Sequence, residues 1–424
     1  MGSMSSAPTL PSSAPLPPPS PTARARRSLA PDVARGLVLL GIALANVPFW
    51  LYGVERGVLL KPIGSESDAV ANAITALLFD NRSFPLFALL FAAGLAQITA
   101  REAARGASWP EARRLLVRRN LWLLAIGAAH GVLLFFGDII TTYAIIGLGL
   151  ILLIRASDRA VIVVGWIGAA ALVLMSAVDG VGRLVDELVA GIPADGPAGG
   201  DLPEFSLIPG TAGAESYPLA VLFNLLTWLP NALSTPIIGL GFLGPMCLGI
   251  IAVRRGWLDR PEEHRALLTR AAAIGLPLSL VGALPVVLAI LGVYELPPLL
   301  EPLATMLHGA SGLVGAAAGL ALIALVAAGS TRPDGARTPL VLRWLAALGR
   351  RSLTGYLLQS VVFMVVFSAW AAGLGYEVGA AVASLIALAT WVATLVLAIV
   401  LDAADRPGPA EWLLRRLVYG RASR

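Results

Sequence analysis

Long runs of apolar residues, separated by short polar segments, fill the chain from about residue 30 to about residue 400. About 20 apolar residues in a helix cross the core of a bilayer, and a helix satisfies its own backbone hydrogen bonds in lipid. Ten runs fit this description to within a few residues. They are 33–52, 83–100, 119–136, 139–154, 160–178, 231–252, 271–292, 303–328, 352–372 and 378–401. The pattern predicts an all-α polytopic membrane protein with about ten transmembrane helices.

Two apolar segments between these runs are too short to span a membrane. "SESDAVANAITALLFDNR" (65–82) is predicted to form a helix at the outer interface that leads into the second run. "YPLAVLFNLLTWLP" (217–230) is predicted to lie at the interface or to re-enter the membrane. It closes an acidic segment, 179–230, that belongs outside. Asn231 and Ser234 are expected to cap the next helix.

The placement of arginine orients the bundle. Every second connection between runs is basic, and the alternate connections are poorer in arginine. By the positive-inside rule, this pattern places both termini in the cytosol. The expected organisation is a disordered tail over 1–28, with a tag remnant and a Pro/Ser-rich stretch, a transmembrane domain over 29–403, and a cytosolic amphipathic segment over 404–424.

The amino-acid composition also indicates a membrane protein, and it limits the kinds of covalent link and metal site that the chain can form. The 424 residues are 57% hydrophobic and 13% charged, and mean hydropathy is +0.80, whereas soluble domains carry about 25% charged residues. The net charge of +5 is explained by orientation in a plasma (inner) membrane rather than by nucleic acid. Cys247 is the single cysteine, which excludes an intrachain disulfide. With three histidines and no Cys/His cluster, no metal site is expected.

His130 and Asp138 are the first candidates for chemistry, because ionisable residues inside a membrane are costly and often functional. Eight helical residues cover about 12 Å, so the two side chains are expected to face one cavity without direct contact. Histidine can accept a proton while a carboxylate orients it. Tyr143 lies near the same level on the next run. The alternative is a structural histidine bonded between helices.

A second group lies near the outer ends of other runs. Asp80 and Arg82 are expected to form an interfacial ion pair, with contact to a substrate as the alternative. His308 is the second candidate base, although the small residues that follow it also favour a role in helix packing.

Two polar sets lie toward the cytosolic side. Asp32 and Arg35 share a helix face. The pair could cap the start of the helix, or Arg35 could hold a phosphate-bearing cofactor. Asn46 lies three turns deeper on roughly the same face. The second set opens the run 352–372 and comprises Arg350, Arg351 and Gln359.

Five stretches resemble, in order, the signatures of the YeiB family, also called DUF418. They are "PDVARGLVLLGIALANVPFW", "HGVLLFFGDIITTYAIIGL", "FLGPMCLGIIAVRRGWL", "GRRSLTGYLLQS" and "GPAEWLLRRLVYG". The family is similar in fold to the transmembrane acyltransferase superfamily, which includes heparan-glucosaminide acetyltransferase and the acyltransferase-3 proteins. The resemblance implies a fold of ten or eleven transmembrane helices. It also implies an activity that transfers an acyl group, often acetyl, from cytosolic acyl-CoA to an acceptor at the other face of the membrane.

The chain departs from that superfamily at the catalytic base. Asn46 stands, relative to Arg35, where the acyltransferase-3 proteins carry their catalytic histidine, and an amide cannot act as a base near neutral pH. The stretch between the first two runs also contains no histidine. Gly355 replaces the family's usual asparagine. If the chemistry persists, His130 is the expected base.

The first hypothesis is therefore a membrane acyltransferase that uses acyl-CoA, most simply acetyl-CoA, and no metal. Arg35, Arg350 and Arg351 would bind the CoA phosphates, and Asn46 or Gln359 would stabilise the oxyanion. The acceptor, a sugar, lipid or other small molecule, would approach from outside. The alternatives are a proton-coupled transporter or exporter of a small amphiphile, and a non-catalytic membrane scaffold. The bilayer is the expected partner, nucleic acid is not, and a homodimer is left open.

Overall fold

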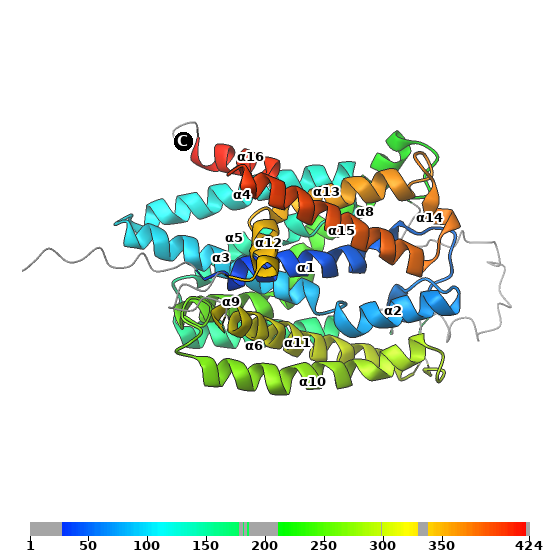
Figure 1. The fold of residues 1–424 in the computed structure, drawn as a ribbon, viewed down its shortest axis with the longest axis horizontal. Coiled ribbons are helices and arrows are strands. Elements are labelled where there is room, and N and C mark those ends of the chain that lie inside the picture. Colours follow the sequence, from blue (N-terminus) through cyan, green and yellow to red (C-terminus); the bar gives the residue numbers. More distant parts are fainter. Residues whose placement is uncertain are drawn as a thin grey trace, which may run out of the picture.

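Most helices run side by side along the long axis of the molecule (Figure 1). The computed structural model describes residues 28–177, 181, 185, 211–297, 299–329 and 338–420. The α-helices are α1 Ala30–Asn46, α2 Glu66–Leu78, α3 Ser83–Ala104, α4 Trp109–Leu133, α5 Ile139–Leu153, α6 Asp158–Met175, α8 Tyr217–Ile238, α9 Leu243–Arg254, α10 Arg265–Ile290, α11 Glu301–Gly329, α12 Leu340–Gly349, α13 Ser352–Phe367, α14 Leu374–Glu377, α15 Ala380–Ala403 and α16 Pro409–Tyr419. Short 3₁₀ helices are η1 Val47–Trp50, η2 Val58–Leu60 and η3 Gly239–Phe242. The described part of the chain contains no β-strand, which confirms the all-α class.

Seven helical segments are long and apolar enough to cross a membrane. They are Ala30–Trp50, Glu66–Ala104, Asp158–Met175, Tyr217–Arg254, Arg265–Ile290, Glu301–Gly329 and Ala380–Ala403. Helices α5, α12 and α13 are apolar but shorter. The architecture is that of a membrane protein, and the count of ten spans and the side on which the termini lie remain predictions.

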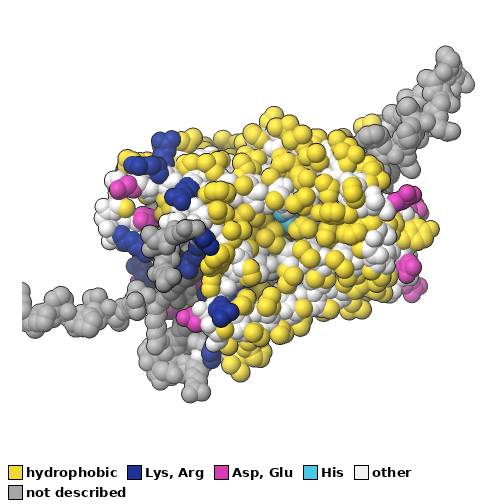
Figure 2. Space-filling model, turned by 90° about the horizontal axis from the view of Figure 1, so that it is seen from above, with side chains coloured by type: hydrophobic (Ala, Val, Ile, Leu, Met, Phe, Trp, Pro, Cys, Tyr) yellow, Lys and Arg dark blue, Asp and Glu magenta, His cyan; other side chains and the backbone are white. Residues whose placement is uncertain are grey.

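The apolar surface of the molecule also agrees with a membrane protein. Large apolar side chains such as Trp166 (74% exposed) and Ile237 (73% exposed) point away from the protein. Figure 2 shows a broad apolar belt, with arginine side chains gathered at one end. We call this the basic end. An exposed apolar belt of this extent matches contact with lipid.

Two predicted interfacial segments belong to the bundle instead. Helix α8 continues unbroken through Pro230 and Pro236, so the prediction of a short interfacial piece at 217–230 was wrong. Asn231 and Ser234 lie inside this helix and are not caps; the Ser234 hydroxyl donates to the Asn231 carbonyl at 3.0 Å. Such bonds are typical where proline interrupts a membrane helix. Helix α2 packs along α10 and α15 rather than across the end of the bundle.

Close contact between α1 and α12 shapes the basic end. Helix α12, which the sequence analysis did not predict, packs against α1 and α15. A Cβ at Gly349 would overlap the backbone carbonyl of Asp32, so only glycine allows this approach. The contact brings Arg350 and Arg351 beside the first turn of α1.

The amphipathic end of the chain is also helical where the structure describes it. Helix α16 packs on α4 and α13, and Arg118 donates two hydrogen bonds to the carbonyl of Leu417, at 3.0 and 2.8 Å. Trp412 and Leu413 remain exposed. The predicted tail over 1–28 lies outside the described residues except for Ser28, as does most of the acidic segment between 179 and 210.

Candidate functional site

His130 and Asp138 are in direct contact. His130 Nδ1 lies 2.8 Å from Asp138 Oδ1, so the expectation that the two side chains would not touch was wrong. The 12 Å spacing applied to one continuous helix, but α4 ends at Leu133 and the chain turns back into α5. Asp138 is the N-cap of α5 and also accepts hydrogen bonds from the backbone N–H groups of Ile140 and Thr141.

The other imidazole nitrogen contacts a residue that the sequence analysis missed. His130 Nε2 lies 2.8 Å from Ser360 Oγ, on α13. The three side chains are almost completely enclosed, with exposed fractions of 2% for His130, 7% for Asp138 and 5% for Ser360. Ser360 directly follows Gln359, so the polar pair on an apolar run was visible in the sequence, but its partner was not.

The hydrogen-bond partners define the roles of the two nitrogens. An ionised Asp138 can only accept, so it assigns the proton to His130 Nδ1. Nε2 is then an acceptor, and the Ser360 hydroxyl donates to it. This tautomer is an assignment from the bonding pattern. The order serine, histidine, aspartate is the arrangement in which a histidine base activates a hydroxyl nucleophile.

A cavity of about 590 Å³ opens beside this cluster at the basic end. Seven arginines and four carboxylates line it. The arginines are Arg35, Arg101, Arg119, Arg350, Arg351, Arg406 and Arg415, and the carboxylates are Asp32, Asp402, Asp405 and Glu411. The excess of guanidinium groups gives the cavity the chemistry that suits an anion, because guanidinium binds phosphate and carboxylate in bidentate geometry.

Several of the predicted arginines also support the fold. Arg35 donates to Asp32 at 3.2 Å and to the Leu90 carbonyl at 3.1 Å. Arg350 and Arg351 both bind Asp402, at 2.7 and 3.0 Å. Arg351 further donates to the carbonyls of Ala347 and Arg406, so it mainly fixes the connection between α15 and α16.

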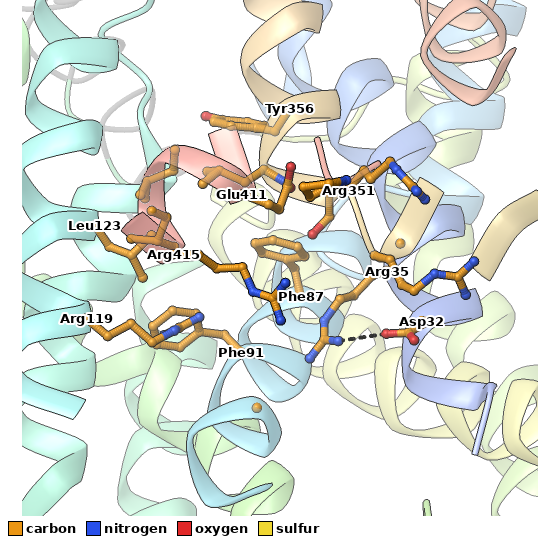
Figure 3. Close-up of a pocket in the computed structure, with 18 of the residues that line it drawn as sticks. Asp32, Arg35, Phe87, Phe91, Arg119, Leu123, Arg351, Tyr356, Glu411 and Arg415 are labelled. Carbon is orange, nitrogen blue, oxygen red and sulfur yellow. Dashed lines mark hydrogen bonds and ion pairs between the residues drawn. The ribbon is translucent and has the colours of Figure 1, made fainter. Parts of the chain in front are cut away.

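Two arginines that the sequence analysis did not assign to the site project into the cavity. Arg119 from α4 and Arg415 from α16 approach the side of Arg35, as Figure 3 shows. The Arg119 guanidinium lies over the ring of Phe91, 5.4 Å from its centroid. Its Nη1 atom is buried and has no hydrogen-bond partner within the described residues. Three cations that converge in this way repel one another unless an anion lies between them.

The inner part of the cavity is apolar and aromatic. Its walls include Phe87, Phe91 and Tyr143, and the Tyr143 hydroxyl donates to the Phe84 carbonyl at 2.9 Å. Tyr356 also lines this part, and its ring centroid lies 4.9 Å from that of His130. One aromatic ring therefore contacts both the cavity and the candidate base.

Asn46 and Gln359 lie outside the lining of this cavity. Asn46 is buried at the end of α1, at its junction with η1. Gln359 is only 2% exposed, and neither its oxygen nor its nitrogen has a hydrogen-bond partner in the part of the chain that the structure describes. A buried, unpaired amide beside Ser360 is costly, which makes Gln359 the better candidate for contact with a ligand.

Asp80, Arg82 and His308 form a separate buried cluster. The Asp80 carboxylate pairs with Lys61 at 2.7 Å, so the expected ion pair with Arg82 was wrong. Arg82 instead donates to the hydroxyl and the carbonyl of Ser279. His308 contacts the Ala76 carbonyl and the Asn81 amide, both at 2.9 Å. Both nitrogens of His308 are engaged, as in a residue that joins helices.

Comparison with known proteins finds a family model and relatives that resemble this chain. Residues 252–421 match the family model described as "Protein of unknown function (DUF418)". The chain is 26% identical to the uncharacterized protein YxaH of Bacillus subtilis (strain 168), over 92% of this chain and 93% of that one. It is also 26% identical to the uncharacterized protein YeiB of Escherichia coli (strain K12), over 92% and 96% of the two chains. No solved structure matches. The family model covers the C-terminal part of the chain, which includes α13 and α16, and the two relatives align over 92% of the chain; together these similarities support a protein of the YeiB/DUF418 family.

Proposed function

We propose that the protein is a plasma (inner) membrane acyltransferase that takes an acyl group, most simply acetyl, from cytosolic acyl-CoA. The observation that carries the proposal is the cavity itself, which has an arginine-rich mouth and an aromatic inner wall against His130. An acyl-CoA has the same order of parts: charged phosphates, a long neutral pantetheine arm, and a thioester at the end.

The phosphates would bind at the basic end. Arg35, Arg119 and Arg415 supply guanidinium groups from three helices, and Arg350 adds a fourth at the mouth. Arg351 also lines the mouth, but its guanidinium group donates to the backbone carbonyls of Ala347 and Arg406 and so supports the fold. The volume of about 590 Å³ lies within the range of 300–1,000 Å³ that is common for small-molecule sites.

The thioester would then lie near Tyr356, next to the His130 cluster. Asp138 holds the His130 ring through Nδ1, which leaves Nε2 as the base. Gln359 would donate from its amide nitrogen to the developing oxyanion, since that donor has no partner within the described residues. Asn46 lies outside the cavity lining, and we do not assign it a role.

The acceptor would approach from the opposite end of the bundle. A hydroxyl or amine of a sugar, lipid or other small molecule fits this chemistry equally. A transporter of small amphiphiles would use the same buried polar groups without any need for CoA, so CoA binding separates the two functions.

Binding of acetyl-CoA and release of free CoA by the purified protein in nanodiscs test the proposal. We expect saturable binding that weakens by roughly tenfold or more in Arg119→Ala, because a charged phosphate contact is lost. Arg113→Ala is the matched control, since Arg113 lies on the same helix, is exposed and does not line the cavity. Absence of binding to acetyl-CoA and to longer acyl-CoAs would refute the donor site and favour transport.

A further inference from the structure

We propose that Ser360 is a nucleophile that carries the acyl group covalently between donor and acceptor. This inference rests on the acyltransferase function proposed above. It assigns the protein a two-step mechanism with an acyl-serine intermediate inside the bundle, instead of direct transfer from acyl-CoA to the acceptor.

The geometry supplies the first reason. Ser360 Oγ lies at hydrogen-bond distance, 2.8 Å, from the nitrogen of His130 that faces away from Asp138. A histidine that only joined helices would be satisfied by any acceptor or donor, as His308 is by a backbone carbonyl and an amide. At His130 the partner is a hydroxyl, and the carboxylate on the far side fixes the tautomer that can take its proton.

The neighbouring side chain supplies the second reason. Gln359 precedes Ser360 on α13, is 98% enclosed, and keeps both polar atoms unpaired in the described part of the chain. An acyl ester at Ser360 or the tetrahedral intermediate that precedes it presents an oxygen that needs a donor. The amide nitrogen of Gln359 has no partner within the described residues, and a turn of its side chain toward Ser360 would make that bond.

The position of Ser360 along the bundle supplies the third reason. One turn before it, Tyr356 lines the donor cavity. One turn after it, Met364 lines a small crevice together with Trp50, Asn224 and Trp370. The indole nitrogens of Trp50 and Trp370 and the side-chain oxygen of Asn224 have no partner within the described residues. Ser360 therefore lies between the donor cavity and a narrow crevice whose wall carries unpaired polar groups.

In the first step the Ser360 oxygen attacks the thioester carbonyl, and its proton passes to His130 Nε2. The carbon–sulfur bond breaks, and the proton on His130 goes to the CoA sulfur, so CoA leaves as the thiol. In the second step a hydroxyl of the acceptor attacks the serine ester, and its proton passes to His130. The ester bond to Ser360 breaks, and the Ser360 oxygen recovers the proton. No other reactant is consumed.

The test is covalent labelling with acetyl-CoA that carries a radioactive acetyl group, without acceptor, followed by acid quench and denaturation. We expect label on the α13 peptide of the wild type, approaching about one acyl group per chain, and background label in Ser360→Ala. Ser360→Cys should restore labelling as a thioester that neutral hydroxylamine releases. Ser311→Ala is the control, because Ser311 is also buried but donates to the His308 carbonyl.

Binding of acetyl-CoA, measured in parallel by calorimetry, separates the two proposals. Binding that is unchanged in Ser360→Ala, with label and turnover reduced at least roughly tenfold, supports the acyl-serine. If Ser360→Ala binds acetyl-CoA and shows the labelling or the turnover of the wild type, the acyl-serine inference is overturned and the proposed acyltransferase function stands. A wild-type protein that binds no acyl-CoA overturns both.

Discussion

Replacing Asp138 by asparagine tests the site most sharply, because the two side chains have nearly the same shape. Asp138 accepts three bonds, from His130 Nδ1 at 2.8 Å, from Ile140 N at 3.2 Å and from Thr141 N at 2.7 Å. In Asp138→Asn, an amide oxygen that keeps the shorter cap bond, to Thr141 N, places the amide nitrogen at the Oδ1 position, which faces the histidine. Two donors cannot face each other, and the proton on His130 must therefore move to Nε2.

The expected magnitude follows from that change of tautomer. With Nε2 protonated, His130 would donate to Ser360 and could not take its proton. In serine, histidine, aspartate sites of known enzymes this substitution lowers kcat by about 10⁴ with the geometry intact. That factor corresponds to about 5.5 kcal/mol of transition-state stabilisation. Binding of acyl-CoA should not change, since Asp138 does not line the cavity.

The assay is the rate of CoA release under single-turnover conditions, with calorimetric binding of acetyl-CoA and thermal unfolding measured on the same samples. Asp138→Ala provides the comparison, because it also removes the cap of α5 and should lower the free energy of unfolding by about 1 kcal/mol. Turnover in Asp138→Asn within tenfold of the wild type would refute the assignment of His130 as the base.

Three further substitutions test the framework of the site by thermal unfolding in detergent or nanodiscs. Glu411→Ala should lower the free energy of unfolding by about 1–3 kcal/mol, because this carboxylate accepts from the Leu353 and Thr354 N–H groups that open α13; an unchanged melting temperature would contradict that role. Gly349→Ala should cost about 1–3 kcal/mol through overlap with α1, and wild-type stability would show that α12 can move away. His308→Ala should cost about 2–4 kcal/mol yet leave acetyl-CoA binding unchanged, and weakened binding would link that cluster to the donor site.

The sequence alone determined the fold class and the approximate position of almost every long helix. This is because a span is a local property: about 20 apolar residues in one run require a membrane or a core, whatever the rest of the chain does. The prediction of helix boundaries failed where a local signal for a helix end was overridden by contacts that the sequence does not show. Prolines and polar residues at 230–236 are typical of a helix boundary, but α8 continues through them because neighbouring hydroxyls bond its backbone.

The tertiary structure decided which polar residues meet. In the sequence, Arg113 and Arg119 both indicate only which side of the membrane α4 begins on. In the structure, Arg119 lines the cavity and Arg113 is exposed outside it. The difference arises from the rotation of α4 within the bundle, which turns Arg119 inward and Arg113 outward. The contact of His130 with Ser360 joins positions 230 residues apart. Apolar patterning specifies that both helices are buried, but the register of α4 against α13 is fixed only when their side chains pack together.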